Sequence, residues 1–171
     1  MKKNLLPVFV LLLLTAAYAA WIAHGTAQLP DRVAIHFGAD GRANGWAHRT
    51  QAAQIFETLV IVPVILLALA LVMRVMPTGA FNLPHRDYWL APERRKETVA
   101  AISGQLIWMD CLLVAFLAGI YQLTIEANRL APPHLPMNLF LALVIGFILA
   151  TILWTILFLR RFFNVPAAPR T

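Results

Sequence analysis

Histidine and acidic side chains between the first two apolar segments, and at the start of the second, are the residues that could do chemistry in this part of the chain. The set comprises His36, Asp40, His48 and Glu57. Imidazoles and carboxylates together could bind Zn²⁺ or exchange a proton near neutral pH, and metal-assisted hydrolysis at His36 and His48 is one hypothesis. A strong zinc motif has two histidines at helical spacing or paired cysteines, and this sequence has neither. We therefore predict no metal site, and expect a buried or half-buried His36 to hydrogen-bond across a turn.

Asp110 is an acidic residue within an apolar run, and such residues are functional candidates in membrane helices. It lies about one turn from the end of that run, on the side where Arg74, Arg160 and Arg161 also emerge. We expect an interfacial ion pair or a carboxyl that reaches the membrane surface. Proton translocation is the alternative, and it would need a second acid deeper in the bilayer.

No arrangement typical of an enzyme is visible in the sequence. It shows no nucleophile–base pair, no phosphate-binding loop and no pair of carboxylates at catalytic spacing. The lone cysteine, Cys111, excludes a disulfide within one chain. We predict a protein that is not an enzyme, with no catalytic residues and no cofactor.

Four apolar runs must position these side chains. They cover residues 5–23, 55–73, 106–125 and 139–159, and each has about the twenty residues that a helix needs to cross a ~30 Å hydrocarbon core. The composition, 60% hydrophobic and 13% charged, agrees with a membrane protein. The sequence predicts an all-α integral membrane fold, a four-transmembrane-helix bundle that forms one domain over residues 1–171.

The basic residues predict the orientation. Ten of the fourteen Lys and Arg residues precede the first run, separate the second from the third, or follow the fourth. The positive-inside rule then places both termini and the 74–105 loop in the cytoplasm, with the 24–54 loop and the 126–138 segment outside. We predict a multi-pass protein of the bacterial cytoplasmic (inner) membrane. Its net charge of +6 reflects topology and contact with the lipid bilayer, so we expect no nucleic-acid binding.

The first run has an alternative interpretation as a signal peptide. Lys2 and Lys3 precede it, and residues 17–19 resemble a cleavage site. The run is longer than the usual 7–15 apolar residues of a signal peptide. We therefore expect an uncleaved helix.

The loop between the first two runs predicts a small hairpin-like extracytoplasmic cap. Val33, Ile35 and Phe37 alternate with less apolar residues, a pattern typical of a strand. Turn signals follow at residues 38–41 and 44–45. Thr50 is the expected N-cap of the second helix.

The 74–105 loop predicts an early start for the third helix. Pro92 at the first helical position, followed by an acid, is typical of a helix start, and the helix should run unbroken toward Asn128. Small residues spaced four apart allow two helices to approach closely. We expect the third and fourth helices to pack on each other in this way, although the same residues could serve a dimer. These are Ala115 and Gly119 on the third run and Ala142, Gly146 and Ala150 on the fourth.

The outer loop resembles a bacterial membrane family known as domain of unknown function 1648. The matching residues are Leu29, Pro30, Val33, His36, Phe37, Gly41, Asn44 and Trp46. The cytoplasmic loop is similar to a second signature of the same family. Its residues are Asn82, Leu83, Pro84, Asp87, Tyr88, Trp89, Leu90, Pro92, Glu93, Arg94 and Arg95. The second motif could form a docking surface for a partner or an aromatic anchor at the lipid headgroups.

The family includes SdpI-like immunity and signalling proteins, so the resemblance implies a binding function. We predict a non-enzymatic accessory, sensor or immunity-type protein, whose outer loop meets a ligand or peptide and whose residues 82–96 meet a protein partner. The alternative is a small transporter or channel subunit that oligomerises through Ala142, Gly146 and Ala150.

Overall fold

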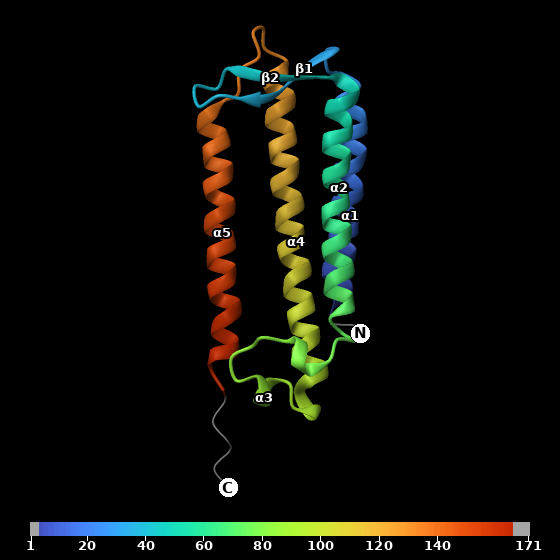
Figure 1. The fold of residues 1–171 in the computed structure, drawn as a ribbon, viewed down its shortest axis with the longest axis vertical. Coiled ribbons are helices and arrows are strands. Elements are labelled where there is room, and N and C mark those ends of the chain that lie inside the picture. The colour runs from blue at the N-terminus through green and yellow to red at the C-terminus, as the bar shows by residue number, and fades with distance from the viewer. Residues whose placement is uncertain (1–3, 166–171) are drawn as a thin grey trace.

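The computed structural model describes residues 4–165 as four long helices, a two-stranded sheet and two short helical segments (Figure 1). The elements are α1 (Leu5–Thr26), β1 (Arg32–Phe37), β2 (Ala43–His48), α2 (Arg49–Val72), η2 (Thr78–Ala80), α3 (Arg86–Trp89), α4 (Pro92–Asn128) and α5 (Met137–Phe163). Helices α1, α2, α4 and α5 are each long and apolar enough to cross a membrane. The chain therefore has the architecture of a multi-pass membrane protein.

The two ends of the bundle differ. The sheet and the connection between α4 and α5 lie at one end, here called the hairpin end (Figure 1). The start of α1, the end of α5 and the connection that carries α3 lie at the opposite end, called the α3 end.

Helix α4 is the central element of the fold. Its 37 residues, about 55 Å at 1.5 Å per residue, contact α1, α2, α3, α5 and β1. It begins with Pro92 in its first turn, where the missing N–H leaves no bond unmade, and it ends at Asn128. Both boundaries confirm the prediction from the sequence.

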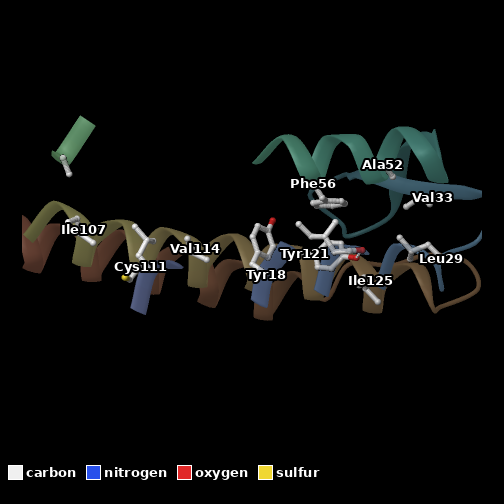
Figure 2. Packing of buried hydrophobic residues seen from close by; sticks show 13 residues of the cluster. Tyr18, Leu29, Val33, Ala52, Phe56, Ile107, Cys111, Val114, Tyr121 and Ile125 are labelled. Carbon is white, nitrogen blue, oxygen red and sulfur yellow. Dashed lines mark hydrogen bonds between the residues drawn. The ribbon is translucent and has the colours of Figure 1, made fainter. Parts of the chain in front are cut away.

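A buried tyrosine joins α1, α2 and α4 in the half of the bundle near the hairpin end. The hydroxyl of Tyr121 donates to the carbonyl of Ile22 at 3.0 Å and lies 3.1 Å from the hydroxyl of Thr26. The rings of Tyr18 and Phe56 pack edge-on against Tyr121, with centroids 6.3 and 4.8 Å away (Figure 2). One side chain of α4 thus satisfies a polar group of α1 and fills the space between three helices.

The hairpin differs in one respect from the predicted pattern. Strands β1 and β2 pair antiparallel, which confirms the strand, but the predicted alternation of burial is wrong. Val33 and Ala34 are both buried while Ile35 is exposed, because the register shifts between Ala34 and His36.

Asn128, at the end of α4, explains why Ala34 is buried. Its side-chain oxygen accepts from the N–H of Ala34 at 2.7 Å, and its side-chain nitrogen donates to the Ala34 carbonyl at 2.9 Å. The amide of Asn128 therefore pairs with the backbone of β1 much as a neighbouring strand would. This contact fixes the hairpin on the bundle.

The predicted N-cap of α2 is wrong by two residues. The helix begins at Arg49, and His48 is its N-cap. The Nδ1 atom of His48 accepts from the Thr50 N–H at 3.4 Å, while the Gln51 side chain accepts from the His48 N–H at 3.2 Å. A reciprocal pair of bonds of this kind satisfies two N–H groups at the helix start, which a threonine at position 50 alone could not do.

We expect Asn128→Ala to loosen the hairpin. The change leaves the buried N–H and C=O of Ala34 without their partner, at a cost of about 1–3 kcal/mol. The measurement is the rate of protease cleavage between residues 29 and 48 in the detergent-solubilised protein. Asn138→Ala, at an exposed position on α5, is the matched control. Equal cleavage rates in both variants and the unchanged protein would show that Asn128 does not hold the hairpin.

Candidate functional site

A groove of about 680 Å³ lies between α2, α4 and α5, in the half of the bundle near the α3 end. Leu66 and Leu69 of α2, Leu113 of α4 and Phe147 of α5 contribute to its walls. Four residues that follow α2 line it as well, namely Met73, Met76, Ala80 and Phe81. Its volume falls in the range of ~300–1,000 Å³ that is typical of small-molecule sites.

Contacts on both sides of α4 position the walls of this groove. The hydroxyl of Ser103 donates to the Ala70 carbonyl at 2.7 Å and ties α4 to α2. On the other side, the indole of Trp154 donates to Gln105 at 3.2 Å and ties α4 to α5. The rings of Phe116 and Phe147 also stack, with centroids 4.3 Å apart. Helix α5 packs mainly on α4, so the groove lies on the side of α5 that faces α2.

Asp110 is buried in this groove with no partner for its carboxyl group. The residue is 2% exposed, and neither carboxyl oxygen has a hydrogen-bond partner among residues 4–165. The expected ion pair or surface-reaching side chain is therefore wrong. Arg160 and Arg161 lie nine or more residues beyond Thr151 on α5, about 14 Å along the helix, and are exposed. The Nε atom of Arg74 is itself buried without a partner in the described chain.

Thr151 is the second polar residue of the groove. Its hydroxyl oxygen is also buried and has no hydrogen-bond partner within the described range. The remaining lining side chains are apolar. The groove thus combines a long apolar surface with one carboxyl and one hydroxyl, an arrangement suited to binding an amphipathic molecule.

The energetics of Asp110 favour an occupant. Burying a carboxylate without a hydrogen-bonding or charged partner is costly, and protonation or a bound donor or cation offsets that cost. The neighbouring Cys111 points elsewhere, since its sulfur lies 3.9 Å from the Pro7 carbonyl of α1. Of the described α4 residues that line the groove, Asp110 is the one with a polar side chain.

His36 does not have the environment that the sequence suggested. The residue is exposed, which corrects the expected burial, and its Nδ1 atom hydrogen-bonds across the turn to the side-chain oxygen of Asn44, as we expected. Gly45 lies opposite, where a Cβ would come within 2.7 Å of the His36 Cβ. The Nδ1 atom of His48 instead lies 3.0 Å from the Thr50 hydroxyl.

The structure does not support metal-assisted hydrolysis at this hairpin. Over residues 4–165, no three side chains of His, Cys, Asp or Glu are placed to hold one metal ion. We do not propose that chemistry.

The remaining hairpin motif residues build and dock the hairpin. Gly41 has φ of 79°, and its carbonyl accepts from the Leu135 N–H at 2.8 Å, which joins the turn to the connection before α5. Leu29 is buried, Phe37 packs near Leu135, and Trp46 lies under the guanidinium of Arg32. Pro30 is exposed after α1.

The second motif packs the α3 end together. The indole of Trp89 donates to the Phe162 carbonyl of α5 at 3.0 Å, and the Thr98 hydroxyl donates to the Trp89 carbonyl at 2.7 Å. The guanidinium of Arg94 lies 4.0 Å over the ring of Tyr88. The exposed members of the motif are Asn82, Asp87, Pro92 and Glu93, while Pro84 is half-buried. The motif therefore serves internal packing and also presents a polar surface.

The small-residue stripes have mixed roles. A Cβ on Gly119 would come within 2.9 Å of the Leu143 side chain, so this glycine permits close packing of α4 and α5. A Cβ on Gly146 would meet no described atom within 4 Å. Oligomerisation through Ala142, Gly146 and Ala150 stays a prediction.

The sequence analysis missed Thr151 and Asn128. Each is a polar residue in or at the end of an apolar helix, and the sequence offered no other indication of a role. Whether such a side chain faces a neighbouring helix, a groove or lipid depends on how its helix is rotated, which an apolar run does not reveal.

Residues 10–67 match the family described as Domain of unknown function (DUF1648), which confirms the resemblance that the hairpin motif predicted. The match covers most of α1, the hairpin and most of α2. Neither the curated proteins nor the solved structures contain a match to the chain. Asp110 and Thr151 lie outside the matched segment, so the groove is argued from this chain alone.

We expect Gly41→Val to destabilise the hairpin strongly. A β-branched residue at positive φ costs on the order of 1–3 kcal/mol. Its Cβ would also approach the Leu135 carbonyl oxygen to 2.6 Å. Gly79→Val is the control, because a Cβ there meets no described atom within 4 Å. Thermal unfolding and the abundance of the protein in membranes measure the effect, and equal values for the two variants would contradict it.

His36→Ala should have a smaller effect than Gly41→Val. The bond from His36 to Asn44 is exposed to solvent, so its loss should cost about 0.5–1.5 kcal/mol. The same unfolding measurement checks this order. A loss of stability as large as that of Gly41→Val would show that the imidazole holds the hairpin closed.

Proposed function

We propose that this protein is a non-enzymatic binding protein of the bacterial cytoplasmic membrane that takes its ligand in the groove between α2, α4 and α5. The Asp110 carboxyl carries the proposal, because a buried acid with neither oxygen hydrogen-bonded in the described structure is costly unless a ligand completes it. The apolar lining matches a ligand that enters from the bilayer. Leu69 and Val72 both line the groove and are more than half exposed, so an apolar molecule could reach it sideways from the lipid.

The connection to α3, which lines one end of the groove, supports a sensor or immunity-type role. Met76, Ala80 and Phe81 line it and belong to the connection that continues into α3. The guanidinium of Arg95 donates to the Met76 carbonyl, so α4 holds the start of this connection. A ligand in the groove would press on a segment whose later residues, Arg86 and Asp87 among them, are exposed.

The charge distribution supports the orientation that this role requires. Seven of the eleven Lys and Arg residues within residues 4–165 belong to the α3 end, which favours a cytoplasmic position for that end, where α1 starts and α5 ends. The hairpin would then lie outside. In this orientation, a ligand in the membrane acts on a surface formed by residues 82–96 that a cytoplasmic partner protein can contact.

Blocking the groove tests the proposal. We expect Thr151→Trp to exclude an apolar probe, because the larger side chain occupies the space beside Asp110. The probe is a monoacylglycerol with a diazirine in its acyl chain, added to the protein in phosphatidylcholine nanodiscs. Mass spectrometry of the labelled peptides then locates the probe. Labelling of the groove peptides should fall several-fold in Thr151→Trp.

Thr155→Trp is the matched control for this experiment. Thr155 lies one turn further along α5, is exposed and does not line the groove. Its variant should therefore label like the unchanged protein. Uniform labelling of all four long helices, or equal groove labelling in the two tryptophan variants, would reject the groove as a binding site.

A further inference from the structure

We infer that the ligand of the groove is a single-chain cationic amphiphile, with a primary ammonium group at Asp110 and Thr151 and an alkyl chain along the apolar walls. This inference rests on the proposed function, because it names the ligand class of the same groove. The chemistry of the lining decides the class.

The polar atoms of the groove match the hydrogen-bonding capacity of a primary ammonium group. Both oxygens of the Asp110 carboxyl and the hydroxyl oxygen of Thr151 are buried with no partner in residues 4–165, and all three can accept hydrogen bonds. An ammonium group has three N–H donors and no acceptor, so it can satisfy several of these oxygens at once. Its positive charge also complements the carboxylate, and charge-assisted bonds are about twice as strong as neutral ones.

Other head groups fit the groove less well. An anionic head group, such as a fatty acid carboxylate or a phosphate, would bring a second negative charge against Asp110 in apolar surroundings. A neutral alcohol supplies a single donor and no charge. Within residues 4–165, no Lys or Arg lines the groove, so an anion would find no compensating cation among them.

The apolar part of the ligand has a defined surface. Leu113 and Phe147 lie beyond Asp110 toward the hairpin end, and Met73 and Phe81 lie toward the α3 end. Apolar surface buried against such walls contributes roughly 25 cal/mol per Å², which favours a long alkyl chain over a small cation. An inorganic cation would contact the polar atoms and leave the apolar walls without a partner.

A competition series tests the head group. Tetradecylamine, tetradecanol and tetradecanoate share one chain and differ in charge, and each competes with the diazirine monoacylglycerol for the groove in phosphatidylcholine nanodiscs. We expect the amine to displace the probe at about one tenth of the alcohol concentration, as a charged hydrogen bond would give. The carboxylate should be the weakest competitor.

Asp110→Asn then separates recognition from membrane partitioning. The substitution keeps the shape of the side chain and removes the charge, so the advantage of the amine over the alcohol should shrink to less than about threefold. Glu126→Gln removes an acid from an exposed position of the same helix and should leave the advantage unchanged. Labelling by the neutral probe alone should persist in both variants, which shows that the groove is intact.

Two outcomes overturn the inference. Equal displacement by amine and alcohol in the unchanged protein would reject the cationic ligand, while continued labelling of the groove would leave the binding function standing. An amine advantage that persists in Asp110→Asn would assign it to partitioning rather than to this carboxyl. Absence of any groove labelling would instead reject the proposed function itself.

Discussion

The fold depends on one helix, α4, against which the other three long helices, α3 and β1 pack. In a membrane, apolar side chains gain little from leaving lipid, so helices are held by close packing and by hydrogen bonds between them. The described structure shows such bonds along most of α4. Asn128 holds β1, Tyr121 holds α1, Ser103 holds α2 and Gln105 holds α5. The positions of the hairpin and of the groove both follow from which face of α4 each of these side chains occupies.

Helix α5 shows what happens where this network is sparse. Its apolar faces are largely exposed, and it packs mainly on α4, through the Phe116–Phe147 stack and the bond from Trp154 to Gln105. Trp89 of α3 adds a bond to the Phe162 carbonyl near its end. Because α5 is held to α4 at these points, the space between α5 and α2 is left for the groove. The burial of Asp110 without a partner in the described chain is a consequence of this spacing.

The sequence predicted those features that depend on local chemistry. The four apolar helices, the start of α4 at Pro92, the strand at β1 and the turn at Gly41 each follow from helix length, proline geometry or turn residues. Features that depend on contacts between distant residues were not predictable in this way. The burial of Ala34 requires Asn128, which is 94 positions away, and the isolation of Asp110 requires knowledge of how α4 is rotated against α5. An apolar run shows almost no face preference, so it carries little information about that rotation.

The matched family segment and the groove are built from different parts of the chain that share α2. Residues 10–67 build α1, the hairpin and most of α2, whereas the groove needs α4, α5 and the connection after α2 as well. The two parts meet at α2, whose Leu66 lies in the matched segment and lines the groove. They also meet at α4, where Asn128 holds the hairpin and Asp110 lies in the groove, 18 residues or about 27 Å apart along one continuous helix. Under the proposed function, α4 would connect the groove to the hairpin, and Met76 and Phe81 would connect it to the α3 end. A ligand in the groove would then contact elements that reach both ends of the bundle.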